Sequence, residues 1–312
     1  MAAPATMKIT FCCRNTKPEP WLAGLQAALP QADIRLWQPG APAADHGVVW
    51  APPQQFFDEQ TRLKGIFNIG AGVDALLKLK LPPNAVVVRL DDAGMAVQMA
   101  EYVCQAVIRH FRELDACALD MRAGQWTFRM PRQRADFPVG VMGLGVLGAR
   151  VAQALSHFEF PVMGWSRTAK NHPGITCFHG PGQLADFLRQ SRVLVNLLPL
   201  TPDTVNILNR DNLSKLYSGG YVINVARGAH LVDADLLALI DSGHLSGATL
   251  DVFRTEPLPP DHPFWRHPGI TLTPHTSART LRTDSIAQIA AKIMALQRGD
   301  SIAGVVDAAR GY

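Results

Sequence analysis

The segment GLGVLG, which contains Gly143, Gly145 and Gly148, constrains the fold more than any other part of the chain. It follows an apolar run and precedes apolar residues at helical spacing, as a strand, a turn and a helix would. In a dinucleotide-binding fingerprint of this order, the first glycine permits the tight turn and the second lets the backbone approach a pyrophosphate. The third lets the helix pack closely on its strand, and the helix N-terminus adds free amides. A glycine-rich turn that binds no ligand is the alternative. The predicted nucleotide contacts here are Gly143, Gly145, Val146, Leu147 and Gly148.

Short apolar runs recur along both halves of the chain and predict two sheets. The first hundred residues alternate helical segments with the runs MKITFCC, DIRLW, GVVWAP, GIFNIG and VVVRL. A second series begins at Phe137 with PVGVMGLG and continues through FPVMGW, ITCFHG, RVLVNLLP, YVINVA, GATLDVF and ITLTP. Continuous apolar strands separated by helices are typical of parallel sheets covered on both faces. The predicted fold class is α/β, with two doubly wound parallel-sheet domains.

Two long helical patterns suggest how these domains are connected. Apolar residues at helical spacing from Ala93 to Ala123, with Gly124 as the C′ residue, predict one linking helix. A last helix near 282–297 ends at Gly299 and could return the chain to the first domain. We therefore expect a Rossmann coenzyme domain at 96–282, inserted in a flavodoxin-like substrate (lid) domain that comprises 1–95 and about 283–312.

Charge and cysteine usage exclude several classes of protein. The chain has 30 basic and 26 acidic residues, a net charge of +4, and these charges are scattered, which argues against binding nucleic acid or a membrane surface. Glycines and Arg150 interrupt the most apolar stretch, at 139–155, and residues 1–6 resemble a dispensable extension rather than a signal peptide. The five cysteines form neither a CxxC pair nor a metal-ligand pattern. We expect a soluble cytoplasmic protein without a metal site.

Cofactor choice is read at the end of the strand after the glycine motif, where an acidic residue would bind the adenine ribose of NAD. Here the chain has Ser166, Arg167 and Thr168. A carboxylate would repel a 2′-phosphate, whereas Arg167 can form charge-assisted bonds to it and the hydroxyls of Ser166 or Thr168 can donate another. The sequence predicts NADPH, with weaker use of NADH, unless Arg167 is only a solvated loop residue.

Three later segments carry candidate chemistry: INVARG with Arg227, LDVFRTEPLP with Glu256, and TLTPHTSA with His275. In this order, after the glycine motif, they resemble the D-2-hydroxyacid dehydrogenase family along nearly the whole chain. GAGVD at 70–74, GWSRT at 164–168, the NLLP loop and the terminal ARGY resemble in particular its members that reduce glyoxylate and hydroxypyruvate. The resemblance implies reduction of small 2-keto acids, glyoxylate to glycolate and hydroxypyruvate to glycerate, by a homodimer.

The reaction itself calls for these residue types. Hydride arriving at a keto carbon leaves charge on the oxygen, and His275 is the predicted acid that neutralises it. Glu256, bonded to the other ring nitrogen, would set the tautomer. Arg227 would bind the substrate carboxylate and polarise the carbonyl. Taken singly, the three could be a loop histidine, a solvated glutamate and a surface arginine.

Further contacts are predicted with less support from the residues themselves. Their position between a strand and a helix suggests that the amides of 70–73 hold the substrate carboxylate, and Trp50 could wall off a small substrate. A structural turn and a core tryptophan are the alternatives. The predicted substrate contacts are Trp50, Gly70, Ala71, Gly72, Val73 and Arg227.

The family resemblance adds contacts to the cofactor. It implies that Asp251 binds the nicotinamide carboxamide. Thr276 and Ser277 depart from the small apolar residues that often follow the histidine in the family, which puts local contacts to the nicotinamide in doubt. The remaining predicted cofactor contacts are Leu198, Pro199, Thr204, Val225 and Ala226.

Two other functions remain open, because a fold alone does not establish activity. The family resemblance extends to transcriptional corepressors, so the chain could be a non-catalytic NAD(P)-binding interaction protein. It could also be a sibling enzyme for larger keto acids, since one methylene changes substrate binding by only about 1–3 kcal/mol.

Overall fold

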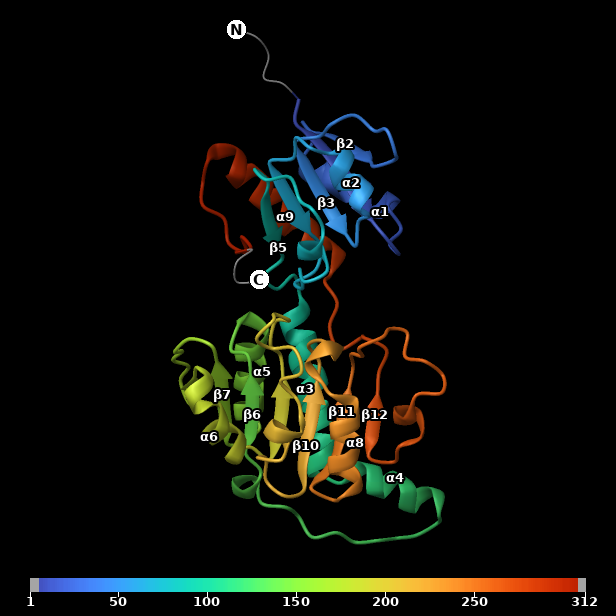
Figure 1. Cartoon of the computed structure of the whole chain (residues 1–312), viewed down its shortest axis with the longest axis vertical. Helices are drawn as coiled ribbons and strands as arrows, with labels where there is room; N and C mark the ends of the chain where they lie inside the picture. Colours follow the sequence, from blue (N-terminus) through green and yellow to red (C-terminus); the bar gives the residue numbers. More distant parts are fainter. Residues whose placement is uncertain (1–5, 308–312) are drawn as a thin grey trace. The chain divides into compact units, whose positions relative to one another are not determined.

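The computed structural model describes residues 6–307, which belong to two compact units (Figure 1). Of the described residues, one unit comprises 6–94 and 279–307, and the other comprises 95–278. Most of the predicted N-terminal extension and the terminal ARGY segment lie outside the described residues. The binding of substrate by one domain and of coenzyme by the other stays a prediction.

The first unit is built on a sheet of five parallel strands in the order β2-β1-β3-β4-β5. This order is the flavodoxin-like one, as predicted, and the apolar runs of the sequence are its strands. Its strands are β1 (Lys8–Cys13), β2 (Asp33–Leu36), β3 (His46–Trp50), β4 (Gly65–Asn68) and β5 (Val86–Arg89).

Helices cover both faces of this sheet. On one face α1 (Glu19–Ala28) packs beside α9 (Arg282–Arg298), whose Ile286, Ile289 and Ile293 enter the same apolar core. As predicted, α9 ends at Gly299, which has a φ of 78°. The other face carries α2 (Gln54–Glu59) and η1 (Leu76–Lys78). A full helix was expected where η1 lies, but the backbone becomes extended at Leu79, shortly before Pro82 and Pro83, so only a single turn forms.

The second unit contains a sheet of seven parallel strands in the order β12-β11-β10-β9-β6-β7-β8 (Figure 1). The order reverses at β6, as in the Rossmann fold, so the segment with the glycine motif starts the sheet at its switch point. The strands are β6 (Val139–Met142), β7 (Val162–Ser166), β8 (Thr176–His179), β9 (Val193–Asn196), β10 (Gly220–Asn224), β11 (Leu245–Leu250) and β12 (Ile270–Leu272).

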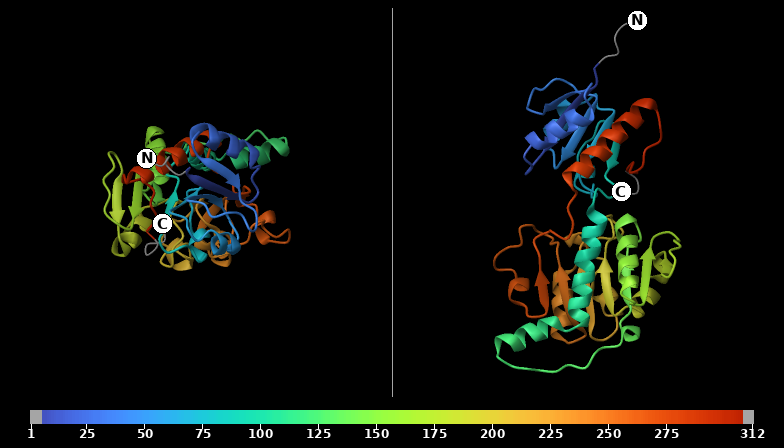
Figure 2. Two further views of the ribbon diagram at one scale, coloured as in Figure 1. Left: turned by 90° about the horizontal axis from the view of Figure 1, so that it is seen from above. Right: turned by 180° about the vertical axis from the view of Figure 1, so that it is seen from behind.

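Two apolar cores lie on the two faces of this second sheet. On one face α3 and α5 pack together against the central strands (Figure 2). On the other face, the core is formed with α6, α7 and α8. The helices are α3 (Met95–Phe111), α4 (Leu114–Arg122), α5 (Val146–His157), α6 (Leu184–Arg189), α7 (Arg210–Leu213) and α8 (Asp233–Asp241), and the short 3-10 turns are η2 (Arg134–Asp136), η3 (Pro181–Gln183), η4 (Gly228–His230) and η5 (Pro263–Arg266).

The predicted linking helix is wrong in one respect, because it is two helices. The chain breaks between α3 and α4 at Glu113, which adopts a left-handed φ of 55° that no helix interior allows. Gly124, with a φ of 65°, follows the end of α4 as expected. Nine residues of α3 are buried, whereas α4 buries none. The apolar periodicity of α4 therefore serves no core of this unit.

Within residues 6–307, none of the helices combines the length and the apolar character needed to cross a bilayer.

Candidate active site

The glycine turn after β6 shows why each glycine is there. Gly143 has a φ of 98°, and a Cβ on it would lie 2.8 Å from the Leu197 carbonyl oxygen. A Cβ on Gly148 would lie 1.7 Å from the Gly143 oxygen, so α5 could not pack on its strand with any other residue there. Gly145 is exposed and has open space where a Cβ would be. The fold thus requires the first and third glycines, while the second leaves bare backbone open to a ligand.

Helix α5 begins directly at this bare backbone. Gly145 is its N-cap, and the Gly145 oxygen accepts a hydrogen bond from the amide of Ala149. The first-turn amides of a helix have no acceptor within the helix, and Val146 and Leu147 supply two of them. Because these amides carry the positive end of the helix dipole, the turn fits a diphosphate.

The end of β7 lies beside this turn, since β6 and β7 are neighbours in register from Val139 to Met142. Ser166 is buried, and its hydroxyl donates to the Thr168 carbonyl oxygen at 2.8 Å. This bond closes a turn with Arg167 at its tip, where Arg167 and Thr168 are exposed. Of the two hydroxyls predicted to assist Arg167, that of Ser166 therefore already has an acceptor within the turn.

The loop after β9 carries three of the predicted cofactor contacts. Thr204 donates through its hydroxyl to the Pro199 carbonyl oxygen at 2.7 Å and accepts from the Thr201 amide at 2.8 Å. The side chain of Leu198 is buried in the core, so only its backbone can face a ligand. The hydroxyl of Thr204 thus shapes this loop, and its contact with a cofactor stays a prediction.

The candidate catalytic residues follow three neighbouring strands of the same sheet. Strands β10, β11 and β12 pair in parallel, and Asn224, Leu250 and Leu272 lie side by side at their carboxyl ends. The segments that carry Arg227, Glu256 and His275 start from this edge. Strands β6 and β9 are parallel to β10, so they end beside it. The glycine turn and these three segments therefore all lie at the carboxyl ends of the strands.

The structure brings His275 and Glu256 together. The Nδ1 atom of the imidazole lies 2.8 Å from Oε2 of Glu256, and the other carboxylate oxygen accepts from the Phe253 amide at 2.9 Å. An ionised carboxylate only accepts, so Nδ1 carries a proton and Nε2 is the nitrogen that can give or take one. The two side chains are 47% and 36% exposed, and a pair so exposed stabilises a fold by about 0–1 kcal/mol at most. The pair is better suited to setting the tautomer than to holding the fold.

The backbone of His275 is held in an unfavourable conformation. Its φ is 54°, which costs a residue with a side chain about 1 kcal/mol or more. Its amide donates to the Asp251 carbonyl oxygen at 2.8 Å. The carboxylate of Asp251, fully buried, accepts from the amides of Thr276 at 2.8 Å and Ser277 at 2.9 Å. Asp251 therefore anchors both sides of the loop on which His275 is presented.

Thr273, which follows β12, also contacts the Asp251 carboxylate and connects it to Tyr102 of α3. The Thr273 hydroxyl donates to the Asp251 carboxylate at 2.5 Å and lies 2.5 Å from the Tyr102 hydroxyl. Burial raises the pKa of Tyr102 to about 12, so its hydroxyl stays protonated at neutral pH. The sequence predictions assigned Asp251 to the nicotinamide and did not include Thr273 or Tyr102. A contact between Asp251 and the nicotinamide stays a prediction beside this anchoring role.

Arg227 lies just before η4 with its backbone held from β10. The Asn224 side-chain amide donates to the Arg227 carbonyl oxygen at 3.1 Å, and one guanidinium nitrogen of Arg227 donates to the Ala226 carbonyl oxygen at 2.7 Å. The side chains of Val225 and Ala226 are buried, so their predicted contact with a cofactor would involve backbone atoms. A Cβ on Gly228 would lie 1.9 Å from the Phe253 carbonyl carbon, so the arginine segment packs directly on the segment that leads to Glu256.

The predicted substrate contacts of the first unit gather around the turn after β4. The side-chain amide of Asn68, a residue that the sequence reasoning missed, donates to the Gly70 and Gly72 carbonyl oxygens at 2.9 Å and 3.0 Å. The Trp50 ring covers Gly70 so closely that a Cβ there would lie 2.3 Å from it. Trp50 is 38% exposed, so the alternative that it is a core tryptophan is wrong. Substrate binding by this turn stays a prediction.

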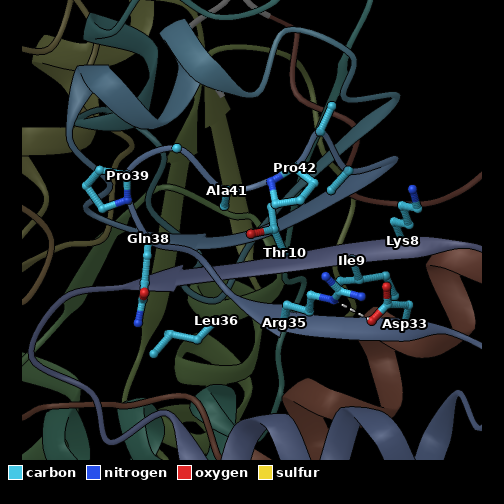
Figure 3. A pocket seen from close by; sticks show the side chains of 13 residues that line it. Lys8, Ile9, Thr10, Asp33, Arg35, Leu36, Gln38, Pro39, Ala41 and Pro42 are labelled. Atoms are coloured by element: carbon cyan, nitrogen blue, oxygen red, sulfur yellow. Dashed lines mark hydrogen bonds and ion pairs between the residues drawn. The ribbon is translucent and has the colours of Figure 1, made fainter.

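A hollow of about 380 Å³ in the first unit includes none of the predicted site residues (Figure 3). It lies against β1, β2 and the segment 38–44. Its Arg35 pairs with Asp33 at 2.8 Å, so the two opposite charges satisfy each other. We assign it no role in the chemistry.

The chain is similar to proteins of a known family. Residues 104–277 match the D-isomer specific 2-hydroxyacid dehydrogenase, NAD binding domain. The chain is 48% identical to glyoxylate/hydroxypyruvate reductase A of Serratia proteamaculans, over 98% of this chain and 100% of that protein. It is 45% identical to the reductase of the same name from Yersinia enterocolitica, with the same coverage.

Two solved structures are similar along nearly the whole chain. A D-isomer specific 2-hydroxyacid dehydrogenase from Xanthobacter autotrophicus Py2, in complex with NADPH and MES, has a TM-score of 0.94 at 38% identity, covering 99% of this chain and 100% of that one. An NADPH-dependent glyoxylate/hydroxypyruvate reductase from Sinorhizobium meliloti, in complex with NADP and sulfate, has a TM-score of 0.92 at 33% identity, covering 98% and 100%.

A Rossmann sheet with a diphosphate-fitting turn, an arginine and a histidine–carboxylate pair at one edge defines a nucleotide-dependent oxidoreductase. The chain belongs to the D-isomer specific 2-hydroxyacid dehydrogenase family. It is therefore an NAD(P)-dependent oxidoreductase that acts on 2-hydroxy acids, and the predicted family and fold class are confirmed.

Proposed function

We propose that this chain uses NADPH to reduce small 2-keto acids, glyoxylate to glycolate and hydroxypyruvate to glycerate. The observation that carries the proposal is the 2.8 Å contact between His275 and Glu256, at the sheet edge that also carries the glycine turn and Arg227. The names of the relatives from Serratia proteamaculans and Yersinia enterocolitica support the choice of substrates.

The proposed chemistry divides between cofactor and protein. NADPH, when bound, supplies the hydride; the amides at the start of α5 would hold its diphosphate. As the keto oxygen gains negative charge, His275 donates a proton from Nε2, because Nδ1 is engaged by Glu256. Glu256 accepts the hydrogen bond from Nδ1, which keeps the ring oriented and stabilises the imidazolium before transfer.

Arg227 has a different task in this proposal. Its planar guanidinium can bind the substrate carboxylate with two parallel hydrogen bonds, which fixes the direction of the neighbouring carbonyl. The Asn224 contact to the Arg227 backbone keeps the base of this side chain in place. Binding a group next to the reacting carbon in this way reduces the entropy lost on reaching the transition state.

The preference for NADPH over NADH rests on Arg167. It stands at the tip of an exposed turn beside the glycine motif, in a position suited to a 2′-phosphate. The relatives solved with NADPH and NADP support the same choice. Hydrogen bonds to charged groups contribute about 1.5–3 kcal/mol, so some activity with NADH is expected.

Replacing Arg167 with alanine should raise the KM for NADPH roughly 10- to 150-fold, the equivalent of one charge-assisted bond, and leave the KM for NADH nearly unchanged. Steady-state assays with both cofactors measure this. Arg189→Ala is a matched control, because Arg189 is 61% exposed on α6 of the same unit and its loss removes the same charge. An equal rise in KM for the two cofactors would rule out the role assigned to Arg167.

Substrate choice and the rival functions are tested together by a panel of keto acids. Loss of NADPH absorbance is followed with glyoxylate, hydroxypyruvate, pyruvate and phenylpyruvate. We expect the highest kcat/KM with the first two. A preference for phenylpyruvate would identify the sibling enzyme for larger substrates, and NADPH binding without turnover of any of them would favour a corepressor-like protein.

We further propose that the chain forms a homodimer through the segment from α4 to residue 130, which we call the arm. The arm exposes large apolar side chains although it is ordered, with Arg129 paired to Asp120 at 2.6 Å. An exposed apolar group of this size on a structured segment is typical of a protein interface. Its exposed apolar residues are Leu114, Leu119, Met121, Trp126, Phe128 and Met130.

A double variant, Trp126→Asp with Phe128→Asp, should convert a dimer to monomers, because two buried carboxylates would lose hydration without gaining partners. Light scattering after size-exclusion chromatography gives the mass directly. Trp265→Asp is the control, since Trp265 is also exposed in this unit but lies outside the arm. A monomeric wild-type chain, or a double variant that stays dimeric, would contradict the assignment.

The cytoplasm is the proposed compartment. The five cysteines are odd in number and include no CxxC pair, which favours a reducing compartment over a disulfide framework.

A further inference from the structure

Three polar side chains are completely buried at the carboxyl ends of β9 and β10. Asn196 and Asn224 are register partners at the last position of the two strands, and His230 lies in η4. The side-chain amide of Asn196 donates to Oδ1 of Asn224 at 3.0 Å and lies 2.9 Å from Nδ1 of His230. A buried polar cluster is costly unless its members satisfy one another, so its presence beside the site calls for a reason.

The contacts define the tautomer of His230. Oδ1 of Asn196 accepts from the Leu198 amide at 3.3 Å, which makes the atom facing His230 the amide nitrogen. An amide nitrogen only donates, so Nδ1 of His230 must accept and the ring proton resides on Nε2. Nε2 lies 3.3 Å from the Pro199 carbonyl oxygen and can therefore donate a hydrogen bond to it.

The three side chains contact both the loop after β9, which we call the cofactor loop, and the segment that carries Arg227. On one side, Asn196 and His230 bond to the backbone of Leu198 and Pro199, in the loop with predicted cofactor contacts. On the other side, Asn224 accepts from the Ala226 amide at 3.3 Å and donates to the Arg227 carbonyl oxygen at 3.1 Å. The three side chains form a continuous hydrogen-bonded connection from the cofactor loop to the substrate arginine.

We propose that His230 is a positioning residue, which sets the cofactor loop and the Arg227 segment at a fixed spacing through Asn196 and Asn224. This inference rests on the proposed function of Arg227. A leucine could fill the volume of His230 but would leave the Asn196 amide and the Pro199 carbonyl without this partner. This positioning role requires a side chain that accepts a hydrogen bond from Asn196 and donates one to Pro199. Imidazole and a glutamine amide can both do so.

The test compares His230→Leu with His230→Gln. For His230→Leu we expect kcat/KM with glyoxylate to fall roughly 10- to 100-fold, the scale of a small misplacement of a binding group, and the Kd for NADPH, measured by nicotinamide fluorescence, to rise. His230→Gln should recover most of both losses. Equal losses in the two variants, or wild-type values in His230→Leu, would overturn the proposal.

A double-variant cycle tests whether the effect passes through Arg227. In an Arg227→Gln background, His230→Leu should produce no further increase in the KM for glyoxylate, because the group that it positions is gone. Additive effects on this KM would overturn the proposal.

Nitrogen-15 NMR of the wild-type imidazole gives a result that depends on no variant being active. The spectrum, assigned by the signals lost in His230→Gln, should show a protonated Nε2 and an unprotonated Nδ1. The opposite tautomer would overturn the proposal. If wild type reduces no keto acid, the proposed function fails, while the tautomer and the NADPH Kd of the variants still test the coupling of His230 to the cofactor loop.

Discussion

The His275→Ala variant is expected to lose about 10²- to 10⁴-fold in kcat for keto-acid reduction, the usual contribution of a positioned general acid, while its Kd for NADPH stays nearly unchanged. Nε2 of His275 is the atom assigned to proton donation, and the predicted cofactor contacts lie on other segments. The exposed pair with Glu256 contributes about 0–1 kcal/mol to folding, so the variant should remain folded.

The assay for this prediction needs both kinetics and binding. Turnover of glyoxylate gives kcat, fluorescence titration gives the Kd for NADPH, and circular dichroism gives the Tm. His179→Ala is a matched control, because His179 is an exposed histidine of the same unit at the end of β8. If His275→Ala loses NADPH binding or stability in proportion to its activity, the histidine is structural and the assignment fails.

Arg227→Gln is expected to reduce kcat/KM for glyoxylate by about 10²- to 10⁴-fold, since two charge-assisted hydrogen bonds of about 1.5–3 kcal/mol each would be lost. The larger part should appear as a higher KM, because the carboxylate is bound in both the ground state and the transition state. A substrate analogue without the carboxylate, such as an aldehyde, should lose far less, because only the polarisation of its carbonyl by Arg227 would be removed.

Steady-state kinetics with glyoxylate and with such an aldehyde separate the carboxylate contact from a general loss of function. Arg266→Gln, at an exposed arginine of the same unit, is the control. Equal losses for the two substrates would mean that Arg227 does not bind the carboxylate.

The sequence predicted those features of the fold and of the site that local patterns determine. Continuous apolar runs marked the strands because parallel strands are buried on both faces. The glycine turn was recognisable because the positive φ of Gly143 and the packing of Gly148 on the Gly143 carbonyl are local requirements, although the Leu197 carbonyl that also excludes a Cβ at Gly143 comes from a distant segment. The C-terminal end of α9 was visible in Gly299, whose left-handed φ suits a residue without Cβ.

Other features depend on contacts between distant segments, and the sequence gives little indication of them. The break at Glu113 lies inside an apolar periodicity that α4 continues, so only the backbone of the folded chain shows it. The anchoring of the His275 loop by Asp251 and Thr273 also needs the register of β11 and β12. Asn196 and Asn224 did carry a signal, because each is a polar residue that ends an otherwise apolar strand.

Hydride transfer to a 2-keto acid is tested most directly by following the hydride itself. The wild-type protein is incubated with glyoxylate and with each of the two NADPH stereoisomers deuterated at nicotinamide C4, and the product is analysed by mass spectrometry. We predict glycolate that contains one deuterium at C2 from one of the two stereoisomers. NADPH consumption without deuterium in glycolate from either stereoisomer, or no glycolate at all, would contradict the account.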